Sequence, residues 1–98
     1  MKRIISKPNL RQYYKTYPDA KTTLEAWLIF VKKAKWQSPN DVIKDFPYAD
    51  SVKKSRIVFN IKGNKYRLVV AIEYQLGIVY IRWFGTHKEY DRINVETI

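Results

Sequence analysis

The first half of the chain places its apolar residues at the spacing of a helix. Between residues 19 and 35 the apolar positions recur at i, i+3, i+4 and i+7, and most charged positions fall off this stripe. The stripe consists of Leu24, Trp27, Leu28 and Val31. A preceding segment, with Pro8 in its first turn, is expected to form a helix that ends before Pro18. The two helices form a predicted hairpin through residues 17–19, with Asp19 as the expected N-cap of the second helix.

The second half changes to the period-two alternation that is typical of strands. The alternating runs cover 57–61, 66–74 and 79–83, with turns at Gly63-Asn64 and at Gly77 between them. Tight turns join neighbouring strands in antiparallel order, so the sequence predicts a three-stranded meander. The third run is apolar on both sides, which favours a central or well-covered place in the sheet.

Two shorter elements complete the expected order. Residues 2–6 are partly apolar and are expected to form an edge strand. A short helix or turn is expected after Ser38, its candidate N-cap. Helices ahead of a block of strands indicate an α+β fold, with the N-terminal helical hairpin packed on one face of a small, mainly antiparallel sheet. Residues 1–98 are expected to form a single domain whose other sheet face is left for a partner.

Composition removes several classes of function. The chain has no cysteine, which excludes disulfides, thiolate metal sites and a thiol nucleophile. No apolar run has the length of a signal peptide or a membrane span, so we expect a soluble cytoplasmic protein with no membrane partner. Glycine-rich phosphate loops, nucleophile elbows and zinc-binding helix motifs are absent from the sequence. We expect no cofactor.

The charge balance points to a polyanionic partner. Nineteen Lys and Arg residues face nine Asp and Glu residues, giving a net charge of +10, above the magnitude of about 2–8 that suffices to keep a small domain in solution. RNA, DNA, an anionic membrane surface and an acidic protein all fit this charge. The basic residues are spread over the predicted strands rather than along one face of an amphipathic helix, which disfavours the membrane.

The basic residues concentrate in and near one segment. Residues 52–72 contain six Lys and Arg residues and no acid. By alternation, Arg67 lies opposite the large apolar residues of its strand, and Arg82 groups with Tyr80 and Phe84, so both arginines are expected on the sheet face away from the helices. Arginine forks bind phosphate, and interleaved aromatic rings stack on bases. The candidate RNA-binding residues are Lys53, Lys54, Arg56, Lys65, Arg82 and Lys88. The alternative is a solvated basic face.

His87 is the only histidine, and it lies just after the last predicted strand. Histidine is the commonest general acid or base near neutral pH. RNA cleavage needs a base for the ribose 2′-hydroxyl, a cation for the phosphate and an acid for the leaving oxygen. A set of Tyr, His, Lys and Arg covers these tasks without a metal. Two alternatives remain open: an ordinary surface histidine, or a metal site that includes Glu89 and Asp91.

The stretch from residue 56 to 91 resembles the HigB family of toxins, which are relatives of RelE. The resemblance is carried by three motifs in order: Val-Phe-Asn-Ile-Lys-Gly-Asn at 58–64, Tyr-Arg-Leu-Val at 66–69 and Thr-His-Lys-Glu-Tyr-Asp at 86–91. It implies a RelE-type fold and metal-independent cleavage of messenger RNA, often on the translating ribosome. It also implies a HigA-like helix-turn-helix antitoxin partner, with operator DNA bound by the toxin–antitoxin complex.

The resemblance suggests three catalytic residues. Arg67 matches a phosphate-binding arginine, His87 matches by position a basic catalytic residue, and Tyr90 belongs to the last motif. Which residue is the general base stays open, because the lysine-rich strand of RelE is replaced here by residues 57–61. Two other hypotheses stand beside the ribonuclease: a non-catalytic RNA- or ribosome-binding inhibitor of translation, and a plain protein-interaction module. Cleaved transcripts would separate the ribonuclease from both.

Overall fold

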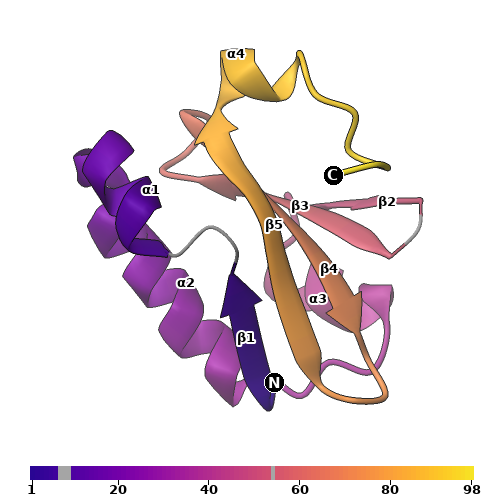
Figure 1. The fold of residues 1–98 in the computed structure, drawn as a ribbon. Helices are drawn as coiled ribbons and strands as arrows, with labels where there is room; N and C mark the ends of the chain where they lie inside the picture. Colours follow the sequence, from indigo (N-terminus) through magenta and orange to yellow (C-terminus); the bar gives the residue numbers. More distant parts are fainter. Residues whose placement is uncertain (7–9, 54) are drawn as a thin grey trace.

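Five strands and several short helices make up the protein, as seen in a computed structural model that describes residues 1–6, 10–53 and 55–98. The helices precede most of the strands along the chain (Figure 1). In chain order the elements are β1 (Arg3–Ser6), α1 (Leu10–Thr16), the 3-10 turn η1 (Pro18–Ala20), α2 (Lys21–Lys33), α3 (Pro39–Asp45), β2 (Asp50–Val52), β3 (Arg56–Ile61), β4 (Tyr66–Glu73), β5 (Ile78–Thr86) and α4 (His87–Tyr90).

The strands form one sheet in the order β1-β5-β4-β3-β2. The predicted meander is confirmed, because β3, β4 and β5 pair antiparallel. The predicted edge strand is also confirmed, and β1 pairs parallel to β5. This pairing places β5 inside the sheet, as its two apolar faces predicted. The α+β class expected from the sequence is therefore confirmed.

The core lies between α2 and one face of the sheet. Leu24 and Val31 of α2 are fully buried, and Trp27 packs edge-on against Phe59 of β3 with ring centroids 5.3 Å apart. The helical stripe predicted from the sequence is the buried face of α2, as expected of an amphipathic helix. The helical hairpin is confirmed too, and α1 ends at Thr16, ahead of Pro18. The expected place of Pro8 in the first turn falls outside the described residues.

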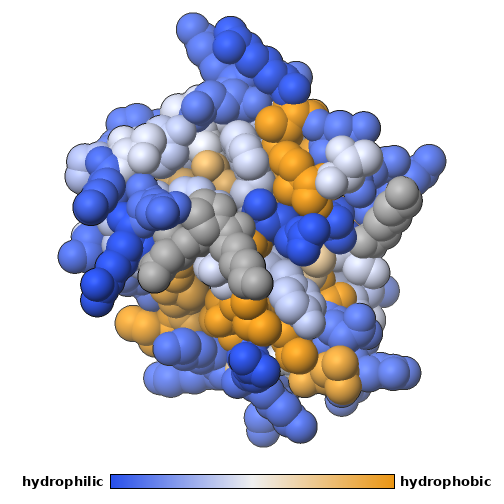
Figure 2. Space-filling view, in the orientation of Figure 1, coloured by the Kyte–Doolittle hydropathy of each residue, from blue (hydrophilic) through white to orange (hydrophobic). Residues whose placement is uncertain are grey.

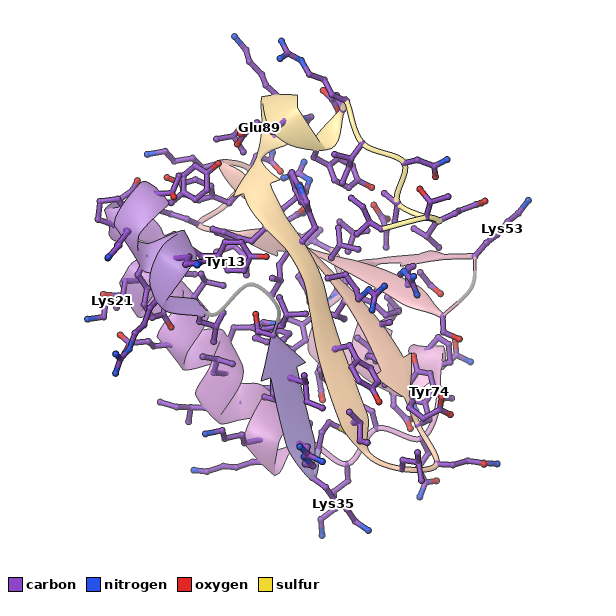
Figure 3. All side chains as sticks on the ribbon, viewed as in Figure 1. Tyr13, Lys21, Lys35, Lys53, Tyr74 and Glu89 are labelled. Atoms are coloured by element: carbon purple, nitrogen blue, oxygen red, sulfur yellow. The ribbon has the colours of Figure 1, made fainter. Side chains whose placement is uncertain are left out.

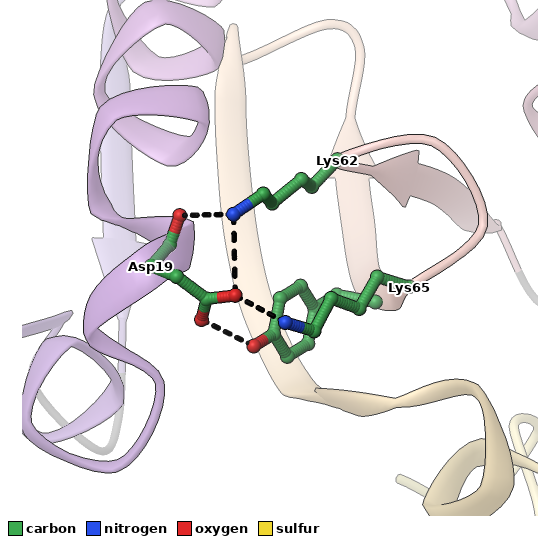
Figure 4. Close-up of polar contacts among 4 residues, drawn as sticks. Asp19, Lys62 and Lys65 are labelled. Carbon is green, nitrogen blue, oxygen red and sulfur yellow. Dashed lines mark hydrogen bonds and ion pairs between the residues drawn. The ribbon is translucent and has the colours of Figure 1, made fainter.

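Of the two predicted helix caps, Ser38 is confirmed in position and Asp19 is wrong. The N-cap of α2 is Ala20, and Asp19 instead lies in η1. The Asp19 carboxylate accepts hydrogen bonds from Lys65 and from the Tyr66 hydroxyl, and it lies 3.2 Å from Lys62 (Figure 4). Ser38 occupies the N-cap position of α3, but its side chain makes no capping hydrogen bond. Asp19 acts across the fold, where three donors from the β3–β4 hairpin outcompete a local cap.

The expected alternation in β5 is also wrong, and the cause is a β-bulge. Val69 pairs with Trp83 but Val70 pairs with Ile81, so Arg82 is an extra residue in β5. An extra residue reverses the faces that follow it. Phe84 is therefore buried in the core instead of lying with Arg82, and Trp83 takes the face away from the helices, hereafter the outer face.

The C-terminal segment lies on the outer-face side of the sheet. It turns back from α4 towards β2 (Figure 1). The main-chain oxygen of Ile98 accepts hydrogen bonds from Arg56 at 2.7 Å and from Arg82 at 3.2 Å. Val58 and Val69 are buried although they lie outside the main core cluster. The outer face is therefore not fully open, contrary to the expectation that it is left entirely for a partner.

Candidate functional site

The candidate site lies at the end of β5, where the strand passes into α4. Thr86 and Glu89 form a capping box that starts this short helix: Glu89 N donates to Thr86 Oγ1 at 3.2 Å, and Thr86 N donates to Glu89 Oε1 at 2.8 Å. The main-chain N–H of His87 donates to the Lys65 carbonyl at 3.1 Å. These bonds fix α4 against the β3–β4 hairpin.

The same carboxylate connects α4 to the helical hairpin. The Tyr17 hydroxyl donates a 2.6 Å hydrogen bond to Glu89 Oε1. The hydrogen bond from the Thr86 main chain, followed by that from Tyr17, lowers the pKa of Glu89. Burial and the Glu89 carboxylate together raise the pKa of Tyr17 to about 12. Glu89 is thus an ionised anchor and Tyr17 a protonated donor at neutral pH.

Gly85 allows an aromatic ring to lie against the main chain of β5. A Cβ atom at this position would stand 2.7 Å from Cη2 of Trp83 and 3.0 Å from Oε1 of Glu89. A side chain fits there only if the Trp83 ring or the strand moves. The Trp83 ring also contacts the ring of Tyr90, with centroids 6.2 Å apart. Two aromatic rings therefore lie together on the outer face beside α4.

Arg67 lies next to these rings, because it is the direct partner of Gly85 in the β4–β5 register. Its Nη1 donates at 3.3 Å to the carbonyls of Asn64 and Tyr66. Its Nε and Nη2 have no hydrogen-bond partner within the described part of the chain. The guanidinium is therefore held by one nitrogen while two others remain able to bind an anion.

The environment of Tyr90 shifts the pKa of its phenol. Burial is the main reason why the pKa of its phenol is raised, and the Asp50 carboxylate raises it further. The positive charge of Arg67 opposes this shift, which places Arg67 and Tyr90 in the same electrostatic environment. The Tyr90 phenol is consequently protonated at neutral pH and can donate a hydrogen bond or a proton.

His87 occupies the first turn of α4 and is half-exposed. Its Nδ1 lies 3.4 Å from Oδ2 of Asp91, four residues later. This contact becomes an ion pair when the imidazole is protonated. His87 and Tyr90 are three residues apart on α4, a spacing that places two side chains on one side of a helix. Arg67 and Tyr90 therefore lie together where β4, β5 and α4 meet, and His87, the third catalytic candidate of the sequence, lies on the same short helix as Tyr90.

The predicted RNA-binding residues are more dispersed than the sequence suggested. Lys88 is exposed on α4, over which the surface is strongly hydrophilic (Figure 2). Lys53 projects from the end of β2, far from Glu89 of the candidate site (Figure 3). Lys54 lies outside the described residues. The Lys65 ammonium is directed to Asp19 on the helix side of the sheet rather than to the outer face.

Arg56 and Arg82 do approach each other, although for a reason that the sequence did not reveal. Both donate to the Ile98 oxygen, which joins β3 and β5 across the outer face. Two guanidinium groups that converge on one oxygen form a local anion-binding arrangement. In this conformation the C-terminal segment occupies it.

Four residues contribute to the site in roles that the sequence did not predict: Tyr17, Asp50, Trp83 and Glu89, the last of which was considered only as a metal ligand. The spacing Thr86-x-x-Glu89 is a recognisable capping box and would have revealed one of them. Asp50 and Trp83 are brought to the site by the pairing register of their strands, which no local sequence pattern specifies. Within the described residues, no group of three His, Asp or Glu side chains is placed to hold a metal ion, and no helix is long and apolar enough to cross a membrane.

Comparison with known proteins gives a consistent result. Residues 20–93 match the family model HigB_toxin, described as the RelE-like toxic component of a toxin–antitoxin system. The chain is 33% identical over 90 residues to the mRNA interferase toxin HigB of Escherichia coli (strain K12), covering 90% of this chain and 86% of that protein. The mRNA interferase HigB of Shigella flexneri is similar to the same extent. That of Escherichia coli O6:H1 is 24% identical over 92 residues, covering 92% and 89% of the two chains.

Proposed function

The chain belongs to the HigB family of RelE-like toxins of toxin–antitoxin systems, and on that premise we propose that it is an endoribonuclease that cleaves messenger RNA. The family inferred from the motifs at 56–91 is confirmed by the match. As the toxin of such a system, it has an antitoxin as a partner. The relatives carry the name mRNA interferase, which supports the same activity here.

The observation that best supports this proposal is the meeting of Arg67, Trp83 and Tyr90 beside α4. A cation with two nitrogens available for an anion stands next to two aromatic rings. Single-stranded RNA presents the complementary groups, phosphates and unstacked bases. Arg67 binds the phosphate at the cut and stabilises the negative charge that builds on it in the transition state.

His87 and Tyr90 then carry the proton transfers in this proposal. His87 removes the proton from the ribose 2′-hydroxyl, and the 2′-oxygen forms a new bond to phosphorus. The bond from phosphorus to the 5′-oxygen breaks, and the leaving oxygen takes the proton of Tyr90. The products are a 2′,3′-cyclic phosphate and a 5′-hydroxyl. Tyr90 can act as the acid because its phenol carries a proton at neutral pH and lies beside Arg67, and Asp91 stabilises the imidazolium that forms on His87.

The wider setting follows the family. We propose that cleavage takes place on the translating ribosome in the cytoplasm, without a metal ion. The proposed antitoxin is a HigA-like helix-turn-helix protein, and operator DNA is bound through the toxin–antitoxin complex. The net charge of +10 supports a polyanionic target, and it strengthens association with RNA at low salt.

The test is to incubate the purified toxin with a defined messenger RNA, free and bound to ribosomes, and to map both new ends. Cleavage that leaves a 2′,3′-cyclic phosphate is the expected result. Intact RNA in both reactions, together with ribosome binding, would favour the non-catalytic inhibitor instead. A 3′-hydroxyl and 5′-phosphate would contradict attack by the ribose hydroxyl.

A further inference from the structure

A cavity of about 420 Å³ opens at the free part of the β3 edge, outside the residues to which the catalytic steps are assigned. One wall comes from the loop between α3 and β2, and the other comes from β3 and its turn into β4. β2 pairs only with residues 56–58 of β3, so the following part of β3 borders the cavity instead of a strand. Its lining includes Asp45, Phe46, Tyr48, Phe59, Asn60 and Asn64.

This cavity is adjacent to Arg67 by two separate relationships. Asn60 is the direct partner of Arg67 in the β3–β4 register, so the two side chains leave the sheet on the same face. Asn64 accepts a hydrogen bond of 3.3 Å from Arg67 Nη1 through its main-chain carbonyl. An RNA whose phosphate is bound by Arg67 therefore has a neighbouring nucleotide at the mouth of the cavity.

The lining of the cavity suits a base and does not suit a phosphate. It contains no Lys or Arg among the described residues, and its one acid, Asp45, accepts a 2.9 Å hydrogen bond from the Trp36 indole. A phosphate would meet a carboxylate without a compensating cation, which is unfavourable. A neutral planar base meets the Tyr48 and Phe46 rings and two asparagine amides, over a floor formed by the buried Phe59.

Tyr48 and the two asparagines supply stacking and hydrogen bonding. The Tyr48 side chain is 85% exposed at the rim, while Phe46 and Phe59 contact each other with ring centroids 5.0 Å apart. The Asn60 amide is exposed, and within the described part of the chain it donates one long hydrogen bond, of 3.5 Å, to the Tyr48 carbonyl. Asparagine carries both donors and an acceptor, so it matches the mixed edges of nucleobases.

We infer that this cavity binds one nucleobase of the RNA, next to the phosphate held by Arg67, with Tyr48 stacking on the base and Asn60 and Asn64 contacting its edge. The inference rests on the proposed ribonuclease function and deepens it. It assigns base preference near the cut to the α3–β2 loop and to Asn60, rather than to the residues that carry out cleavage.

The first test compares cleavage of a messenger RNA pool with randomised codons, bound to ribosomes, by wild type and by Tyr48→Ala, Asn60→Ala and Leu76→Ala. Leu76 is a matched control because it is an apolar side chain 60% exposed in the β4–β5 turn. Loss of a stacked base corresponds to roughly 5- to 150-fold weaker binding. Tyr48→Ala and Asn60→Ala should lower cleavage within this range and flatten the base preference at one position beside the cut. Leu76→Ala should retain both rate and preference.

The result that overturns the inference is a wild-type base preference at every position in both cavity variants, with the variants folded by circular dichroism. Arg67→Ala distinguishes the two subsites, because it should reduce cleavage at all sequences alike and leave the preference unchanged.

A second measurement separates this inference from the proposed function. A single-stranded RNA with 4-thiouracil bases and 2′-O-methyl riboses cannot be cleaved through its 2′-oxygen, but it can be photocrosslinked. Crosslinks to the 46–48 segment or to Asn60 are expected, whether or not the protein cleaves RNA. Crosslinks that avoid both would overturn the cavity assignment even if the wild type is an active ribonuclease.

Discussion

The Tyr17 hydroxyl and the Glu89 carboxylate form a 2.6 Å hydrogen bond between residues that are 72 positions apart in sequence. It joins the loop of the helical hairpin to the helix that presents His87 and Tyr90. The same Glu89 oxygen accepts the Thr86 main-chain N–H. One carboxylate therefore determines both where α4 begins and how it sits on the helical layer.

Replacing Tyr17 by Phe tests this connection. The variant keeps the ring and its packing on Phe84 and Tyr66 but removes the donor. We expect a loss of about 1 kcal/mol in the free energy of unfolding, measured by urea denaturation. We also expect the pKa of Glu89 to move back towards its ordinary value and cleavage to fall, because α4 is held less firmly. Unchanged stability and activity would show that the bond has no positioning role.

Gly85→Ala should be damaging although the substitution adds only one methyl group. The new Cβ would stand 2.7 Å from the Trp83 ring, which must move or distort β5. We expect a cost of about 1–3 kcal/mol in unfolding free energy and a changed tryptophan fluorescence spectrum.

Gly77→Ala is the matched control for general destabilisation. Gly77 has a φ of +68°, so alanine is strained there by about 1–2 kcal/mol, at the opposite end of β5. Cleavage should fall with Gly85→Ala and persist with Gly77→Ala at a temperature where both variants are folded. Equal cleavage activity in the two variants would show that the position of the Trp83 ring does not affect cleavage.

Much of the architecture was predictable because burial imposes a period on the sequence. The stripe that includes Leu24 and Val31 is buried in α2, and alternation located β3 and β4 correctly. The β-bulge was not predictable, because the extra residue Arg82 is defined by pairing between Val69 and Val70 on another strand. Up to Arg82 the alternation holds, and beyond it every face is reversed.

The site was predictable only where local motifs carry it. The Thr-His-x-Glu-Tyr-Asp motif singled out His87 and Tyr90, but it did not predict the short helix α4 on which they lie. Asp19 illustrates the limit: a helix-capping aspartate and one that binds the β3–β4 hairpin look alike in sequence, and tertiary donors decided between them. The contact of Arg56 with the C-terminal segment is likewise a tertiary contact that no local pattern predicts, because the two residues are 42 positions apart.

The Asp19 cluster predicts an acid-sensitive part of the stability. Hydrogen bonds from Lys65 and Tyr66, followed by Lys62, lower the pKa of Asp19 below its ordinary value of 3.8. A lowered folded-state pKa stabilises the fold above the unfolded value, and this contribution is lost as the pH falls through the folded-state value. Asp19→Asn should therefore lower the urea midpoint at pH 7, and the difference from wild type should shrink below about pH 4. A constant difference between pH 7 and pH 3 would contradict this role.

Arg67 is expected to act through its fork as well as through its charge. Arg67→Lys retains the charge but presents a single ammonium, so we expect cleavage to fall at least about tenfold. The salt dependence of RNA binding should stay close to wild type in Arg67→Lys. In Arg67→Ala the log–log slope should weaken by about 0.7, the value for one single-strand phosphate contact. Full activity of Arg67→Lys would reduce the role of Arg67 to electrostatic attraction alone.

The most direct test of the account is the single-turnover rate of messenger RNA cleavage by His87→Ala on purified ribosomes. Lys35→Ala is the control, because Lys35 is exposed at the end of the molecule opposite Glu89 (Figure 3). The loss of a general base typically costs 10²–10⁴-fold in rate. We predict a fall of at least about 100-fold for folded His87→Ala and a near wild-type rate for Lys35→Ala. Cleavage by His87→Ala at the wild-type rate would contradict the assignment of His87 as the general base.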